Sequence, residues 1–181
     1  MLTILIILVL VVGFYSGVRR GLALQLVYTG GYLLSYLAAK TFYLDLAPKL
    51  ELYVPYPSAT PDTKLVFFDQ TITLELDQAF YAAVAFLLIL FIGWLLTRFV
   101  GILVRGLMYM PILKQMNGLA GGILSFAVVY IGLFLLLSIL SLIPMDMIQH
   151  QFAQSGLARF IVEHTPIFTK DIYHMWIEQM I

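Results

Sequence analysis

Four long runs of apolar residues alternate with polar segments along the chain. The apolar runs cover residues 1–18, 22–39, 79–97 and 119–143, and the third could extend to residue 104. At a rise of about 1.5 Å per residue, a helix of about 20 residues crosses a hydrocarbon core of about 30 Å. All seven prolines lie outside the four runs, and proline is the residue that most disturbs a helix interior. The pattern predicts an all-α integral membrane protein with four transmembrane helices.

The first run has no positive charge before its apolar residues, since the chain begins Met1-Leu2-Thr3-Ile4. A cleaved signal peptide carries its cations at that place. Here the first arginines, Arg19 and Arg20, follow the run instead. We therefore expect residues 1–18 to form an uncleaved span.

The charged residues predict which connections face the cytoplasm. Five of the ten Lys and Arg residues lie in the connections after the first and third runs, where the sequence has no Asp or Glu. Short loops rich in Lys and Arg stay on the cytoplasmic side. We therefore expect residues 17–21 and the loop 98–118 inside, and both termini, the loop 40–78 and the tail 144–181 outside. The five topology determinants are Arg19, Arg20, Arg98, Arg105 and Lys114.

Composition leaves room for one membrane domain, residues 1–143, and no sizeable soluble core. Hydrophobic residues make up 62% of the chain and charged residues 11%, whereas soluble domains average about 25% charged residues. The chain has no cysteine, which excludes disulfides, thiolate metal sites and cysteine nucleophiles.

The tail, residues 144–181, has an amphipathic pattern and is too polar for a fifth span. Ser155 is a candidate cap for a short helix, and Thr165-Pro166 is a candidate start for the last one. Such helices could lie on the outer membrane surface, fold back onto the spans or contact a neighbouring subunit. The apolar stripe of the last helix is predicted to contain Phe168, Ile172, Trp176 and Met180.

The sequence contains no recognisable catalytic or cofactor-binding motif. It lacks a nucleophile elbow, a phosphate-binding loop and a His-Glu-x-x-His pair. The sequence spacings between the three histidines suit no common metal site. These histidines are His150, His164 and His174. No charge lies within a span, where ion-coupled pumps usually carry one. We therefore expect no enzymatic activity, no cofactor and no bound metal.

Small residues recur every four positions at the predicted inner ends of two spans. In a membrane this spacing lets helix backbones approach closely. One interpretation is that these residues pack helices together within one subunit. The other is that they form a face that lines a subunit interface or a pore. Gln25, an amide within the second span, is expected to form a cross-helix hydrogen bond or to contact a substrate. The small residues are Gly13, Gly17 and Gly21 in the first set, and Gly118, Gly121, Gly122 and Ser125 in the second.

Two short segments resemble a known family. Gly17-Val18-Arg19-Arg20-Gly21 leads into the second span and resembles a pattern of Arg-Gly followed four residues later by Glu, a position that Gln25 occupies here. Asn117-Gly118-Leu119-Ala120-Gly121 resembles the pattern Asp/Asn-Arg-x-x-Gly-x-x-x-Gly, with Gly118 in place of Arg and Ser125 in place of the last Gly. Over nearly its whole length the chain resembles the colicin V production protein (CvpA) family, in the form typical of Gram-positive bacteria.

The resemblance implies a protein of the bacterial cell membrane that acts in colicin V production or export and in envelope function. It implies no known biochemical activity. Two molecular hypotheses follow. The protein is either an oligomeric channel or transporter for a small solute, with the fourth span lining the pathway, or a non-conducting scaffold for an export or envelope complex. The expected partners are the lipid bilayer, further copies of the chain and an export or envelope protein. No nucleic acid is expected.

Single cysteines introduced into this cysteine-free chain test the predicted topology. A cysteine at Ser58 or at Lys170 should react with a membrane-impermeant thiol reagent in intact cells. A cysteine at Lys114 should react only after the membrane is permeabilised, because its connection is predicted to face the cytoplasm. Labelling at Lys114 with protection at Ser58 would show the opposite orientation.

Overall fold

The fold is a bundle of four long helices with a helical tail. The computed structural model describes residues 1–57, 65–68, 76–105 and 114–178. Within these residues, four helices are long and apolar enough to cross a membrane, which confirms the predicted fold class. The long helices are α1 (Leu2–Arg20), α2 (Leu22–Leu50), α4 (Leu76–Arg105) and α5 (Lys114–Ser141). The tail contains α6 (Asp146–Gln154), α7 (Gly156–His164), α8 (Phe168–Tyr173) and the π-helical turn η1 (His174–Glu178).

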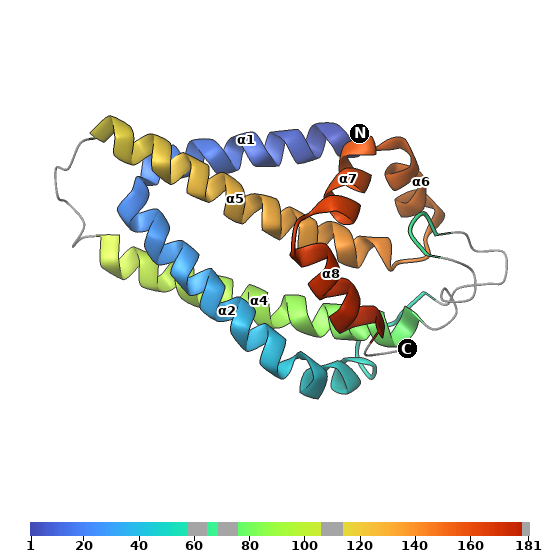
Figure 1. Cartoon of the computed structure of the whole chain (residues 1–181). Coiled ribbons are helices and arrows are strands. Elements are labelled where there is room, and N and C mark those ends of the chain that lie inside the picture. Colours follow the sequence, from blue (N-terminus) through green and yellow to red (C-terminus); the bar gives the residue numbers. More distant parts are fainter. Residues whose placement is uncertain (58–64, 69–75, 106–113, 179–181) are drawn as a thin grey trace.

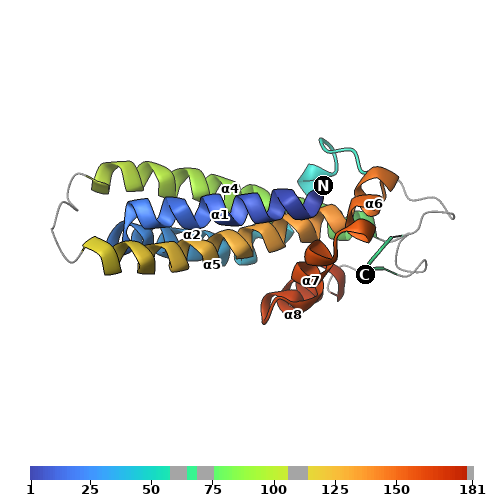
Figure 2. The same ribbon diagram turned by 90° about the horizontal axis from the view of Figure 1, so that it is seen from above.

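The long helices are arranged as two pairs, α1 with α5 and α2 with α4 (Figure 1). A further contact between α2 and α5 joins the pairs. The N-terminus and the tail helices lie at the same end of the bundle, which we call the tail end (Figure 2). The α1–α2 junction, the end of α4 and the start of α5 lie at the other end, the junction end. This alternation agrees with the predicted order of spans, and the cytoplasmic location of the junction end stays a prediction.

Three of the helices are longer than the predicted spans. α2 continues past Ala39 to Leu50 and has 29 residues, so it is about 44 Å long and exceeds a hydrocarbon core of about 30 Å. The segment 40–50, predicted as loop, is therefore helical and includes Pro48. The predicted inner loop 98–118 is likewise helical at both ends, because α4 runs to Arg105 and α5 begins at Lys114. Pro48 lies in the last turn of α2, so the hydrogen bond that its missing N–H removes is near the end of the helix and not in its middle.

The tail folds back onto the long helices. Trp176 is 1% exposed, and its ring meets the ring of Phe86 of α4 edge to face at 5.7 Å between centroids. The hydroxyl of Tyr43 in α2 donates a hydrogen bond to the carbonyl of Met175 at 3.2 Å. Ile172 and Ile177 are also buried, while Met180 lies outside the described residues. Of the three arrangements left open by the sequence, the structure shows this one.

One predicted helix start in the tail is confirmed and the other is wrong. The Ser155 side chain caps α7 by accepting a hydrogen bond from the Ala158 N–H at 3.2 Å. Thr165 instead lies at the end of α7, where its hydroxyl donates to the Ile161 carbonyl at 2.6 Å. Helix α8 begins only at Phe168, after Ile167 with a φ of 69°. Thr165 is a poor start here because its hydroxyl is used by the preceding helix.

A buried glutamine fastens the tail to the last turn of α5. The Gln149 amide donates hydrogen bonds to the carbonyls of Ser141 at 3.3 Å and Ile143 at 2.9 Å. Its carbonyl oxygen accepts from the Val66 N–H at 3.0 Å. Helix ends leave carbonyl groups without intrahelical hydrogen-bond partners. The Gln149 side chain supplies donors to such carbonyls and so joins α6 to the end of α5 and to the segment 65–68.

The Tyr56 hydroxyl supplies another hydrogen-bond donor just after the end of α5, since it donates to the Leu142 carbonyl at 2.9 Å. Burial, with smaller effects of Asp77 and Tyr81, raises the pKa of Tyr56 to about 12. The phenol therefore remains protonated, and able to donate this hydrogen bond, across the physiological pH range.

Truncation of Trp176 tests whether this packing holds the tail. Loss of a buried tryptophan side chain costs about 3–5 kcal/mol. Trp176→Ala should therefore speed proteolytic cleavage within residues 166–178 at least tenfold in detergent-solubilised protein. Membrane insertion of the spans should be unchanged. Tyr173→Ala, which alters a side chain that is 42% exposed, should be cut at the wild-type rate. Equal cleavage of both variants and wild type would contradict the packing.

Candidate functional site

The two predicted sets of small residues face each other across the contact between α1 and α5. A Cβ atom on Gly17 would overlap the Ser125 side chain and the Gly121 carbonyl. A Cβ atom on Gly121 would lie 2.7 Å from the backbone carbon of Gly21 and 2.8 Å from the Gly17 carbonyl oxygen. Both distances are too short for a real side chain, so only glycine fits at these places. We call this region the glycine contact.

The glycine contact continues along both helices. The Ser125 hydroxyl, which is buried, donates a hydrogen bond to the Gly13 carbonyl at 2.8 Å. A Cβ atom on Gly13 would lie 2.8 Å from a methyl carbon of Val129. A Cβ atom on Gly122 would meet Val18 at 2.6 Å, whereas Gly118 has more room, with its closest neighbour, the Val18 carbonyl, at 3.2 Å. The predicted small-residue faces are therefore occupied by each other within one chain.

Asn117 joins the glycine contact to the start of α2. Its side-chain oxygen accepts a hydrogen bond from the Leu22 N–H at 2.7 Å, across 95 positions of sequence. This N–H belongs to the first turn of α2 and has no intrahelical acceptor. Gly21, beside it, has a φ of 78°, which glycine adopts at little cost. The two segments that carry the family resemblance thus meet in space.

Gln25 is buried in α2, with 1% of its surface exposed. Its backbone carbonyl accepts a hydrogen bond from the Thr29 hydroxyl at 2.8 Å. Its side-chain oxygen Oε1 is buried and has no hydrogen-bond partner among the described residues. This oxygen therefore makes no cross-helix hydrogen bond within the described residues, and the expected role of Gln25 stays a prediction. A buried acceptor without a partner is costly, so Oε1 is a place for a water molecule or a polar ligand.

The basic residues of the junction end lie against aromatic rings. The guanidinium carbon of Arg20 is 5.1 Å from the ring centroid of Tyr28, and that of Arg98 is 5.2 Å from the same centroid. Arg98 also lies 5.3 Å from the Trp94 ring, and Arg19 lies 5.9 Å from the Tyr15 ring. The charge count identified the arginines but not Tyr28, whose ring both Arg20 and Arg98 contact. Side chains of Arg105 and Lys114 lie outside the described residues.

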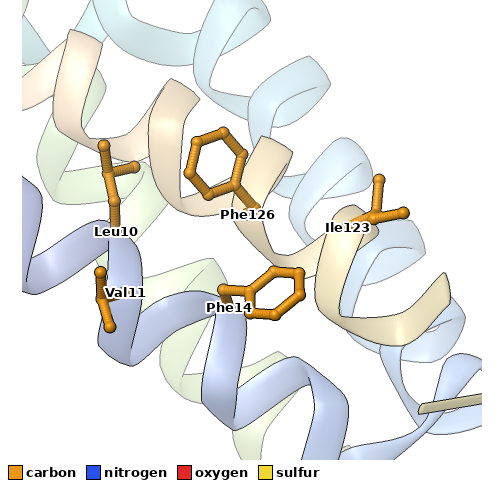
Figure 3. A pocket seen from close by; sticks show the side chains of 5 residues that line it. All are labelled: Leu10, Val11, Phe14, Ile123 and Phe126. Atoms are coloured by element: carbon orange, nitrogen blue, oxygen red, sulfur yellow. The ribbon is translucent and has the colours of Figure 1, made fainter. Parts of the chain in front are cut away.

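An apolar hollow of about 370 Å³ lies on the surface between α1 and α5 (Figure 3). Its wall is made only of aliphatic and aromatic side chains, and it opens outward between the two helices. Sequence analysis missed it because these positions belong to uniformly apolar runs, in which no spacing distinguishes them. The lining residues are Leu10, Val11, Phe14, Ile123 and Phe126.

Within the described residues, no three His, Asp or Glu side chains come together as a metal site would require. His164 lies 3.8 Å from Glu163 at the surface, and the His150 ring contacts Gln154 at 3.3 Å. Both pairs lie on the tail helices and are exposed. Among the candidate site residues, the structure brings together the small residues of the glycine contact, and it places Arg20 and Arg98 around Tyr28.

Comparison with known proteins gives the chain a family. The model of the family described as "Colicin V production protein" matches residues 2–166. The chain is 34% identical over 177 residues, 97% of its own length and 97% of the other chain's, to a Bacillus subtilis (strain 168) protein named "Uncharacterized transmembrane protein YshB". No solved structure matches it. A family model that matches most of the chain shows that the protein belongs to the colicin V production protein (CvpA) family.

Proposed function

We propose that this CvpA-family protein is a non-conducting membrane scaffold that supports toxin production or export and envelope function. The observation that carries the proposal is the glycine contact. A pore lined by α5 would need the small residues of that helix to face an open pathway. In this chain these residues pack so closely on the backbone of α1 and Gly21 that a Cβ atom on Gly121 would lie 2.7 Å from the Gly21 carbonyl carbon and 2.8 Å from the Gly17 carbonyl oxygen, which supports a packing role for them.

The polar groups within the spans support the same proposal. The hydroxyls of Ser35, Thr97 and Ser138 each donate to a backbone carbonyl four positions earlier, at 2.7, 2.7 and 2.8 Å. Hydroxyls bonded in this way satisfy themselves inside the helix and offer little to a passing solute. The tail, held on α2 and α4 by Tyr43 and Phe86, is then the part that would contact a partner in an export or envelope complex.

An oligomeric small-solute channel is the second candidate. The buried Oε1 of Gln25, which has no hydrogen-bond partner within the part of the chain that the structure describes, favours it, because a polar atom inside a span attracts water or a solute. The pathway would then follow the junction-end half of α2 rather than the small residues of α5. Both candidates are compatible with a homo-oligomer.

Purified protein in liposomes separates the two candidates. The scaffold proposal predicts potassium and small-dye flux no greater than in empty liposomes, with a pore-forming peptide as the positive control. Native mass spectrometry should give a multiple of the chain's mass. Protein-dependent flux that is lost in Gln25→Leu would overturn the scaffold and support the channel.

Two substitutions in α5 complete the experiment. Gly121→Leu would force α1 and α5 apart, and overpacking of this kind typically costs about 1–3 kcal/mol. We expect a lower melting temperature in detergent and no change in flux. Ile123→Leu, at a position that is 60% exposed, is the matched control and should melt like the wild type. Normal melting of Gly121→Leu would remove the support that the glycine contact gives to the scaffold proposal.

A further inference from the structure

The tail makes a strained turn between α7 and α8. Ile167 has a φ of 69° and a ψ of −56°, and among the residues that the structure describes it is the one residue other than glycine with a positive φ. The Phe168 N–H donates a hydrogen bond to the Pro166 carbonyl at 2.8 Å, which closes a γ-turn of the rare, strained kind. A β-branched side chain fits these backbone angles poorly. The connection between α7 and α8 therefore stores backbone strain.

The strain follows from the placement of α8 and not from the surroundings of Ile167. The Ile167 side chain is 76% exposed, so few neighbours press on it. Three residues separate the end of α7 from the start of α8. Across this connection the Thr169 hydroxyl donates a hydrogen bond to the Val162 carbonyl at 3.1 Å. A connection this short leaves Ile167 little choice of conformation while α8 lies beside α7.

Residues 168–178, which we call the end segment, are held on the long helices by contacts that do not involve α7. The ring of Phe86 and the hydroxyl of Tyr43 contact η1. The Lys40 ammonium of α2 lies 3.6 Å from the Asp171 carboxylate of α8. Every copy of the chain offers the same ring, hydroxyl and cation. These contacts can therefore form between two chains as well as within one.

The buried face of the end segment indicates which partner could take it. Ile172, Trp176 and Ile177 are at most 5% exposed, and the exposure of such side chains to water is costly. A partner must therefore cover this apolar face and also place a cation beside Asp171. A second copy of the chain does both without any further adaptation. Short hinges under strain favour such an exchange of identical elements between copies.

We propose that two copies of this chain exchange their end segments, so that residues 168–178 of each chain pack on α2 and α4 of the other. In the exchanged dimer Ile167 takes a negative φ, which relieves the strain of the turn. The contacts of Tyr43, Phe86 and Lys40 are kept, and the hydrogen bond between Thr169 and Val162 is given up. The exchange is independent of the scaffold proposal, since it serves a conducting and a non-conducting protein equally.

Cross-linking at the ion pair between Lys40 and Asp171 tests the exchange in the full-length protein. A carbodiimide joins a carboxylate and an amine that are in contact through an amide bond, and these two side chains are 44% and 48% exposed, so the reagent can reach them. Two variants, Lys40→Ala and Asp171→Asn, are produced together in the same cells. Neither variant can form the link within itself. A link therefore requires Lys40 of one chain beside Asp171 of the other.

The proposal predicts a covalent dimer of the two variants, identified by its joined peptides. Half of all randomly paired dimers are mixed and each mixed dimer holds one complete ion pair, so full exchange gives about a quarter of the wild-type yield of the link. Each variant produced alone is the control and should give no link. A link in wild-type monomers with none in the co-produced pair would overturn the proposal. Absence of the link from the wild type would overturn it too, because the ion pair itself would then be absent.

Substitutions at the turn test whether its strain drives the exchange. Ile167→Gly, placed in both chains of the pair, should lower the yield of the link between chains at least threefold, because glycine adopts a positive φ at little cost and the end segment then stays on its own chain. Ile167→Val is the matched control. It keeps the β-branched side chain and the strain, and should give the yield of the unsubstituted pair. Equal yields from the glycine and valine variants would contradict the role of the strained turn.

Discussion

The close backbone contact between α1 and α5 is the interaction on which the bundle depends. Lipid tails are as apolar as leucine side chains, so helices in a membrane gain little from burying apolar surface and rely on close packing. The only buried residues of α1 are Ile6, Gly13 and Gly17, and the two glycines lie in this contact. Without it, α1 would have few other contacts, because α2 touches it mainly near the junction.

The same contact fixes the two ends of the bundle. At the junction end, Asn117 accepts from the Leu22 N–H and so sets the start of α2 relative to α5. At the tail end, the Thr3 hydroxyl of α1 lies 2.8 Å from that of Ser155, the cap of α7. The position of α1 therefore affects both the arginines around Tyr28 and the place where the tail packs. The packed tail is the surface that our scaffold proposal assigns to a partner.

The sequence predicted what depends on local pattern and missed what depends on tertiary contact. Hydrophobic run lengths gave four spans, and four-residue spacing identified Gly17 and Gly121. The same spacing could not decide whether these glycines meet within one chain or between chains, because it describes one helix face and not its partner. The end of α2 and the start of α8 were misplaced, since α2 continues to Leu50 with Tyr43 and Ala47 buried, and Thr165 ends the preceding helix instead. Tyr28 and Gln149 each contact a residue far along the chain, Arg98 and Val66 respectively, and no local signal marks such a contact.

A disulfide between α1 and α5 tests most directly whether their contact lies within one chain. A Cβ atom on Gly13 would be 3.1 Å from the Cβ of Val129, close to the separation of about 3.5–4.5 Å that a disulfide needs. Oxidation in membranes of the variant with cysteines at Gly13 and Val129 should link the two positions inside single chains. The intact oxidised protein should keep the mass of a monomer, and proteolysis should release the two cysteine-containing peptides joined to each other. Disulfide-linked dimers without the internal link would contradict the account, because the contact would then lie between subunits.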